Sequence, residues 1–435
     1  MITTDYNIKT IIPEELDNLK AIAGVNISKI TLDDHPNLLV FPDSFESYDR
    51  DFGKKKICDI INDNELYTNS IVGFIGRNKT HLSICSRFTN EDKEDFFLHY
   101  MLQKVANINL FSLQHTMSED SVFDFLIYLF PLYLKKAINQ GLYKQYITKN
   151  YNDANVKGLI DINKHIKHNI PFNGKIAYTT REYSYDNDIT QLIRHTIEFI
   201  RKHKCGENVL NADNDTTQSV SQIISATPSF IPNNVQLIIN KNLRPIVHPY
   251  YSEYSPLQRL CLQILRHEEL KYGQEENEVY GILIDAAWLW EEYIATILEG
   301  KYIHYFKDRG KRFYLFENFQ QIIPDYISID KKNVADAKYI PLNKESWYGE
   351  EKATSIYYKT IAYMYRFCSN TGYLFYPYSD EDTNPIELRI KTEIEGVNGG
   401  NIIKLGLRIP IDCNNFTEFS SKMKNYEEEF IQYCT

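Results

Sequence analysis

The sequence lacks the features that would place this chain in a membrane or an oxidising compartment. Its longest apolar run, Phe123 to Leu134, contains Asp124 and Pro131 and is too short to span a bilayer. The N-terminus shows no basic-then-apolar secretory signal. The seven cysteines are scattered, with no C-x-x-C pair and no Cys/His spacing typical of a zinc site. We therefore expect reduced thiols, a cytoplasmic protein and no association with a membrane.

Signatures of nucleotide binding and of independent DNA binding are also missing. No Gly-x-x-x-x-Gly-Lys-Ser/Thr segment is present, so we expect no nucleotide to be bound by this chain itself. The 48 Lys and Arg residues are outnumbered by 58 Asp and Glu residues, which gives a net charge of −10. Because proteins that bind DNA alone gain affinity by neutralising phosphates, this balance favours a subunit that reaches DNA through a partner.

The length and composition are those of a globular protein with more than one domain. A chain of 435 residues, 43% hydrophobic and 24% charged, is long enough for two or three cores. We expect a mixed α+β (α/β) chain in three parts: residues 1–150, β-rich and then helical; residues 151–255, a basic strand and helix segment with a linker; and residues 256–435.

Local patterns predict several elements within these parts. Ile71–Ile75 and His81–Cys85 flank a turn and indicate a hairpin. The pattern is helical from about 91 to 147, with Gly141 as a stop. Further predictions are strands and loops over 150–190, helices over 189–204, 256–270 and 355–368, a linker over 206–217, strands over 372–376, 386–390 and 402–409, and a solvated helix face at 427–429.

The most informative stretch is a second predicted hairpin. The apolar runs Ile322–Ile329 and Val334–Ile340 flank a polar, turn-forming break at 330–333. Alternate side chains share one face of a strand, so Asp336 and Lys338 should point the same way, with Asp325 on the neighbouring strand converging on them.

Two carboxylates and one ammonium on a sheet face suit a Mg²⁺-dependent phosphodiesterase. Carboxylates bind a hard cation, and a lysine beside them can orient the attacking water or neutralise charge on the phosphorus centre. The alternative is a surface hairpin whose solvent face happens to carry Asp and Lys, since D-x-K triplets are common.

A third carboxylate is expected from a preceding helix. Residues Tyr280–Glu299 have helical periodicity, with Glu292 on the polar face and Glu291 interrupting an apolar stripe. A carboxylate that faces a core is costly unless it is paired or binds a cation, which favours Glu291 as a metal ligand. The alternative is a helix-edge glutamate that reaches water or an arginine.

Together these residues resemble a known family. An aromatic-Glu-x-aromatic helix, then Pro324-Asp325, then Asp336-Ala337-Lys338-Tyr339, is similar to the PD-(D/E)xK nuclease domain of the McrC family, the endonuclease subunits of McrBC-type restriction systems. Residues Lys157–Asp188 are similar to the central segment of that family and Ile71–Arg87 to its N-terminal β-region.

The resemblance implies a fold, a site and partners. A C-terminal restriction-endonuclease-like domain would follow an N-terminal partner-binding region. The catalytic set would be Asp325, Asp336, Lys338 and Glu291, with Mg²⁺ (or Mn²⁺) held by Asp325, Asp336, Glu291 and the Ala337 carbonyl. The implied partners are a McrB-like hexameric AAA+ GTPase, docking within residues 1–150, and modified double-stranded DNA.

Two positions depart from the pattern of the family. Lys359 stands where the family usually has a glutamine near the active site, and Thr190 replaces an expected asparagine in the central segment. A lysine at 359 would suit contact with the scissile phosphate.

A basic and aromatic segment leads into the predicted nuclease hairpin. Basic residues interleaved with aromatic ones suit contact with the DNA backbone, although a solvated loop explains the same pattern. The candidate DNA-binding residues of this segment are Lys307, Arg309, Lys311 and Arg312.

The sequence thus predicts a metal-dependent endodeoxyribonuclease of a restriction complex that acts in phage defence. Two alternatives stay open at this point. One is a non-catalytic scaffold that stimulates an NTPase ring, and the other is a repair nuclease that works without a motor.

Overall fold

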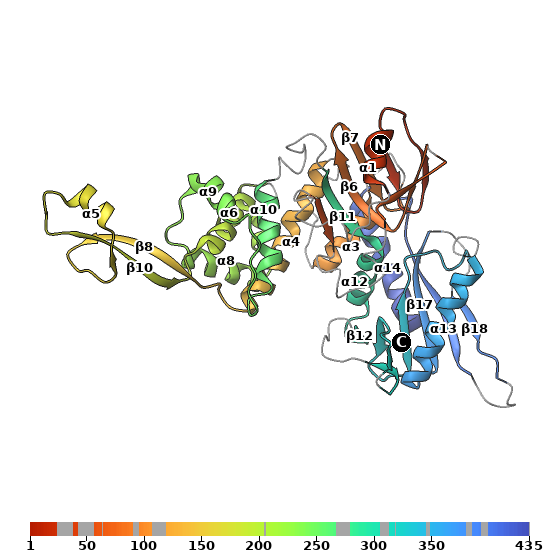
Figure 1. Ribbon diagram of the computed structural model, residues 1–435. Helices are drawn as coiled ribbons and strands as arrows, with labels where there is room; N and C mark the ends of the chain where they lie inside the picture. The colour runs from red at the N-terminus through yellow and green to blue at the C-terminus, as the bar shows by residue number, and fades with distance from the viewer. Residues whose placement is uncertain are drawn as a thin grey trace. The chain divides into compact units, whose positions relative to one another are not determined.

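The computed structural model (Figure 1) describes residues 1–23, 38–41, 56–62, 64–89, 95–106, 119–203, 206–266, 279–304, 313–317, 319–344, 349–379, 385–392 and 399–434. The chain forms two compact units. The first joins Met1–Val122 to Glu268–Thr435, and the second is Phe123–His267.

A five-stranded sheet of the first unit combines N-terminal strands with one strand from far along the chain. Its order is β1 (Ile2–Thr4), β7 (Thr80–Cys85), β6 (Ile71–Arg77), β11 (Val279–Asp285) and β3 (Leu38–Phe41). The predicted β6–β7 hairpin is confirmed, and its turn contains Asn78 with φ 54°, a conformation that asparagine tolerates in tight hairpin turns.

A smaller sheet and a helix complete the N-terminal core. The sheet has the order β2 (Ile8–Thr10), β5 (Glu65–Thr68) and β4 (Cys58–Ile61), and helix α1 covers Leu16–Ile22. The side chains of Leu19, Leu66, Ile75 and Leu82 are fully buried in one hydrophobic cluster.

The helix predicted over Tyr280–Glu299 is wrong in its first part. Tyr280–Asp285 belong to β11, which pairs antiparallel with β6 and parallel with β3, and helix α12 covers Ala286–Ile297. The Asp285 side chain caps the helix by accepting a hydrogen bond from the Ala287 amide at 2.9 Å. A strand that is buried between two others is apolar on both faces, so its sequence lacks the alternation that would distinguish it from a buried helix.

The C-terminal sheet of the first unit contains the second predicted hairpin. Its order is β12 (Tyr302–His304), β15 (Tyr326–Ser328), β16 (Asn333–Ala337), β17 (Thr371–Tyr378), β19 (Asn401–Arg408) and β18 (Ile386–Arg389). The β15–β16 hairpin is confirmed, and β16, β17 and β19 run parallel. Helix α13 (Gly349–Phe367) lies in the crossover that the parallel β16–β17 pair requires. A separate ribbon consists of β13 (Tyr314–Phe316) and β14 (Phe319–Gln321).

Two further helices pack against α12, α3 (Phe96–Ala106) through aromatic rings and α14 (Phe416–Cys434) through a buried hydrogen bond. The Phe97 ring lies 6.3 Å from that of Trp290 and 6.4 Å from that of Tyr293. Glu427 was expected on a solvated face, and this is wrong. It is buried and accepts hydrogen bonds from the Tyr293 hydroxyl at 2.7 Å and from Lys104 at 2.9 Å.

The second unit consists of helices and a long β-ribbon. The helices are α4 (Glu119–Asn139), α5 (Ile162–Asn169), α6 (Asp188–Lys202), α7 (Gly206–Leu210), α8 (Asn214–Ala226), the short 3₁₀ helix η3 (Pro232–Asn234), α9 (Val235–Lys241) and α10 (Tyr254–Leu265). The linker predicted over 206–217 is wrong, because α7 and the start of α8 lie there and Val209 and Leu210 are buried.

The ribbon pairs β8 (Gln145–Asp153) with β10 (Ile176–Ser184), and β9 (Leu159–Ile160) adds to its end. Helix α5, which the sequence did not predict, lies at this end (Figure 1). We call residues 145–184 the arm.

The expected three-part division differs from these units in its boundaries. Helix α4 lies within 1–150 but largely in the second unit, and β11, within 256–435, completes the N-terminal sheet. The roles assigned to the three ranges stay predictions. None of the described helices has the length and apolar character needed to cross a membrane.

Candidate functional site

The hairpin brings the two predicted aspartates together. Asp325 directly precedes β15 and Asp336 lies in β16, and the register pairs Tyr326 with Ala335. The Asp325 carboxylate accepts a hydrogen bond from the Ala337 amide at 2.7 Å, which holds it against the end of β16. Both carboxylates therefore lie at one end of the hairpin, as the alternation of side chains predicted.

Two lysines contact Asp336. The side chain of Lys338 forms an ion pair with Oδ2 of Asp336 and donates to the Ala337 carbonyl at 3.3 Å. The ammonium of Lys359, on α13, lies 3.7 Å from Oδ1 of the same carboxylate. Asp336 itself is only 1% exposed, so its charge is balanced inside the protein rather than by water.

Glu291 lies on α12, which packs against β16, and its role as a metal ligand stays a prediction. Its Oε1 atom lies 3.0 Å from Nε2 of His304, and its main-chain carbonyl accepts a hydrogen bond from the Tyr326 hydroxyl. The prediction for Glu292 is wrong, because Glu292 is buried rather than on a solvated face. Helix α12 is covered on more than one side, so an apolar stripe alone does not identify its exposed face.

The carboxyl groups have different proton affinities. Burial, followed by the negative charges of Asp336 and Glu291, raises the pKa of Asp325 well above its usual value. Burial opposes ionisation of Asp336 as well, but the ammonium groups of Lys338 and Lys359 lower its pKa to about 2. Burial, with the charges of Glu292 and Asp336, raises the pKa of Glu291 to about 8. Such divergent values are typical of functional sites.

The donor set suits a hard divalent cation, although its geometry is incomplete. Within the described ranges, no three Asp, Glu, His or Cys side chains are arranged to hold a metal ion. Oδ1 of Asp336 is nevertheless buried and accepts no hydrogen bond from the described part of the chain. Carboxylate and carbonyl oxygens are the ligands that Mg²⁺ prefers, so Asp325, Asp336 and the Ala337 carbonyl fit this ion chemically.

Most of the predicted DNA-binding residues fall outside the described structure. Lys307, Arg309, Lys311 and Arg312 lie in the segment 305–312, which the structure does not describe. Lys359 is described, and its half-exposed side chain lies beside Asp336 and 5.5 Å from the centre of the Tyr363 ring. It is therefore the predicted DNA contact that the structure places at the carboxylates.

The sequence did not predict the apolar surface at the end of the arm. Six large apolar side chains there are more than half exposed, which is unusual for so short a segment. These arm-tip residues are Leu159, Ile160, Ile162, Ile166, Ile170 and Phe172. Their local sequence also contains Lys157, Lys164, Lys167, His168 and Lys175. The sequence analysis predicted only strands and loops over 150–190, and the exposure of these side chains is seen only in the structure.

Comparison with known proteins gives a family for most of the chain. The family model for the McrBC 5-methylcytosine restriction system component matches residues 66–377. No curated protein matches. A solved structure described as a refined half-complex from a tetradecameric assembly of Thermococcus gammatolerans McrB AAA+ hexamers with bound McrC has a chain that is 13% identical, with a TM-score of 0.48. That match covers 100% of this chain and 99% of the other.

A second solved structure, the Thermococcus gammatolerans McrBC complex, matches at 15% identity with a TM-score of 0.32, over 68% of this chain and 86% of the other. Because both TM-scores are below 0.5, the assignment rests on the family model, which spans more than half of the sequence and includes Asp325, Asp336 and Lys338. The chain belongs to the family of McrBC 5-methylcytosine restriction system components.

Proposed function

We propose that this chain is the endonuclease subunit of a McrBC-like restriction complex, with a C-terminal PD-(D/E)xK domain that hydrolyses DNA phosphodiester bonds. The observation that carries the proposal is the meeting of buried Asp336, Asp325 and Lys338 at one end of the β15–β16 hairpin, next to Glu291 of α12. A structural hairpin has no need for two neighbouring carboxyl groups whose pKa values are shifted in opposite directions.

Asp325, Asp336 and the Ala337 carbonyl are the proposed ligands of Mg²⁺ or Mn²⁺, with Glu291 completing the acidic set. Such an ion supplies charge stabilisation at the phosphate and lowers the pKa of a bound water. Lys338 is held at the carboxylates by Asp336, where its ammonium is placed to orient the attacking water. Asp325 is fixed by the Ala337 amide, so its carboxylate keeps one orientation.

Lys359 is the proposed contact to the phosphate backbone at the site, together with Lys307, Arg309, Lys311 and Arg312. The net charge of −10 makes such local cations necessary, because the protein as a whole repels DNA. Only Lys359 among them lies in the described structure, beside Asp336.

The proposed partners are modified double-stranded DNA and a McrB-like hexameric AAA+ GTPase. The sequence contains no P-loop, so nucleotide hydrolysis belongs to the partner. The docking surface was expected within residues 1–150, and the exposed arm-tip residues favour the arm instead. Large apolar side chains exposed together are typical of protein interfaces.

A plasmid cleavage assay tests the proposal. Wild type and Asp336→Ala are compared in Mg²⁺, each with and without a McrB-like partner and GTP. The proposal is supported if wild type cleaves only when partner and GTP are present and Asp336→Ala cleaves under no condition. Cleavage by wild type without the partner supports an independent nuclease. No cleavage at all, with GTP turnover stimulated equally by both proteins, supports the scaffold.

A further inference from the structure

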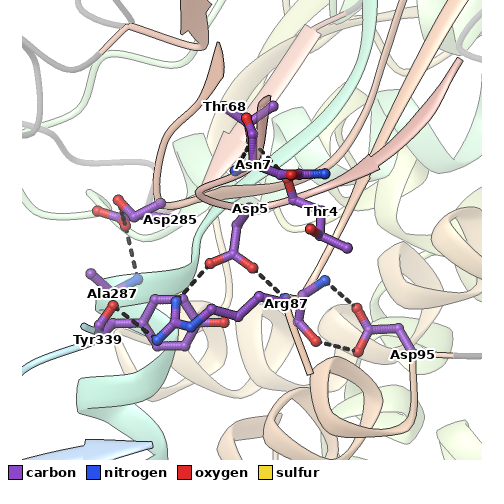
Figure 2. A network of polar contacts seen from close by, with 11 residues as sticks. Thr4, Asp5, Asn7, Thr68, Arg87, Asp95, Asp285, Ala287 and Tyr339 are labelled. Atoms are coloured by element: carbon purple, nitrogen blue, oxygen red, sulfur yellow. Dashed lines mark hydrogen bonds and ion pairs between the residues drawn. The ribbon is translucent and has the colours of Figure 1, made fainter. Parts of the chain in front are cut away.

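A buried polar network connects the N-terminal sheet to the chain beyond Lys338 (Figure 2). Arg87 follows β7, and its Nη1 atom donates to Oδ2 of Asp5 at 2.8 Å. The Arg87 amide donates to the other oxygen of the same carboxylate. Nη2 of Arg87 donates to the main-chain carbonyl of Tyr339 at 3.3 Å. One guanidinium thus bridges residues far apart in the sequence.

Both ends of this bridge are rigidly placed. Asp5 is 1% exposed and lies in a turn that buried Thr68 holds, since the Thr68 hydroxyl donates to the Thr4 carbonyl at 2.6 Å. The guanidinium lies 4.3 Å from the centre of the Tyr339 ring and 4.9 Å from that of Phe88. A planar cation between rings, with a carboxylate at one edge, has little freedom to rotate.

The bridge acts on the main chain that carries Lys338. Strand β16 ends at Ala337, so Lys338 and Tyr339 lie beyond its ladder. Three successive residues are held from three directions: the Ala337 amide by Asp325 at 2.7 Å, the Lys338 amide by the Phe375 carbonyl at 2.7 Å, and the Tyr339 carbonyl by Arg87 at 3.3 Å. Of these three anchors, only Arg87 comes from the N-terminal sheet.

We propose that Arg87 is a positioning residue for the nuclease site: held by Asp5, it fixes the Tyr339 carbonyl and thereby the direction in which Lys338 leaves the strand. The inference rests on the proposed function, because the position of Lys338 matters only if this residue acts in DNA cleavage. The simpler alternative is that the Asp5–Arg87 pair only ties β1 to β7, which a buried ion pair also does.

Arg87→Gln removes the charge and the forked donor, and Arg194→Gln is its matched control. Arg194 is paired with Glu198 at 2.9 Å and lies 4.8 Å from the centre of the Phe230 ring, but it belongs to the second unit. Because small displacements of catalytic groups cost about 100-fold in rate, we expect kcat for plasmid cleavage to fall about 100-fold in Arg87→Gln. The half-saturating Mg²⁺ and DNA concentrations should change less than about threefold, and Arg194→Gln should cleave like wild type.

Hydrogen exchange gives a readout that does not depend on cleavage. We expect residues 334–342 to exchange faster in Arg87→Gln than in wild type, and to be unchanged in Arg194→Gln. If protection is lost only around residues 1–5 and 80–89, the pair is a structural tie and the inference is wrong. If wild type never cleaves, the nuclease proposal fails, while exchange at 334–342 still decides whether Arg87 holds this segment.

Arg87→Lys covers the case in which the glutamine variant does not fold. Lysine keeps a positive charge beside buried Asp5 but lacks the second nitrogen that reaches Tyr339. We expect a folded protein with the same loss of kcat and the same faster exchange at 334–342. Wild-type kcat in this variant would show that charge alone suffices and would overturn the positioning role.

Discussion

Oε1 of Glu291 lies 3.0 Å from Nε2 of His304, so the helix carboxyl group is tied to the last residue of β12. The main-chain carbonyl of Glu291 is tied to the same sheet through the Tyr326 hydroxyl of β15. Both the side chain and the backbone of this residue are therefore positioned by the strands that carry the hairpin. This arrangement holds Glu291 against the sheet that carries the hairpin, rather than leaving it free on the helix surface.

The raised pKa of Glu291 predicts a pH-dependent contribution to stability. Its folded-state pKa of about 8 exceeds the usual value of 4.5, so its contribution to stability is fully present below about pH 4.5 and is lost as pH rises through 8. Glu291→Gln has no proton to lose. From pH 6 to pH 9, without divalent cations, the free energy of unfolding should shift by about 3 kcal/mol in favour of the variant. Urea denaturation of both proteins measures this shift, and a difference that does not vary with pH would contradict the raised pKa of Glu291.

The two lysines at Asp336 should have different roles. Lys338→Gln should abolish cleavage, because its ammonium is the one in contact with Asp336 Oδ2. Lys359→Gln introduces the residue that the family resemblance leads us to expect there, and it should lower kcat less than about tenfold while weakening DNA binding. Removing one phosphate contact should also make the slope of log affinity for DNA against log salt concentration shallower by roughly one.

Cleavage rates measured over a range of DNA concentrations at two salt concentrations separate these effects. Equal loss of kcat in both variants would show that Lys359 acts in the chemical step.

Exposed apolar residues of the arm should matter for the partner and not for folding. The side chain of Leu159 is 81% exposed, so Leu159→Ser should leave the thermal stability unchanged. If the arm docks on the AAA+ ring, this variant should lose the stimulation of GTP hydrolysis and, with it, plasmid cleavage. Val247→Ser is the control, because Val247 is 94% exposed in the same unit but outside the arm. Full stimulation by Leu159→Ser, measured as GTP turnover, would place the docking surface elsewhere.

The local part of the site was predictable from the sequence. The turn-forming residues 330–333 and the apolar runs beside them specify a hairpin, and strand alternation then places Asp325, Asp336 and Lys338 together. Glu291 was also singled out, because a carboxylate within an apolar stripe needs a partner, and it is paired with His304. These inferences depend on neighbours in the sequence, for which simple periodicity is a sufficient guide.

The long-range part was not predictable. Arg87 and Asp5 meet the Lys338 segment across more than 250 residues of sequence, and no local pattern predicts such a contact. The strand β11 was also missed, because the apolar run 279–285 is equally compatible with a helix. Two residues held signals that were missed. Asp285 is a typical helix cap, and Gly281, the second residue of the predicted helix, is a poor helix former.

The pairing of β6 with β11 supplies a prediction about stability. Gly281 has a φ of +142°, and a Cβ atom at this position would lie 2.3 Å from the main-chain oxygen of Phe74. Backbone cannot move aside as a flexible side chain does, so Gly281→Ala should separate the two strands and destabilise the protein by about 3 kcal/mol or more. Gly300→Ala is the control, because Gly300 also has a positive φ, +77°, but a Cβ atom there meets nothing within 4 Å.

The control should cost only about 1 kcal/mol, the strain of a left-handed conformation without a clash. Thermal denaturation of the two variants compares these costs directly. Because β11 leads into α12, the separation caused by Gly281→Ala should also release Glu291 from His304 and lower cleavage. Equal melting temperatures for the two variants would mean that β11 is not held in the N-terminal sheet as described, and the connection from Arg87 to the nuclease site would lose its structural basis.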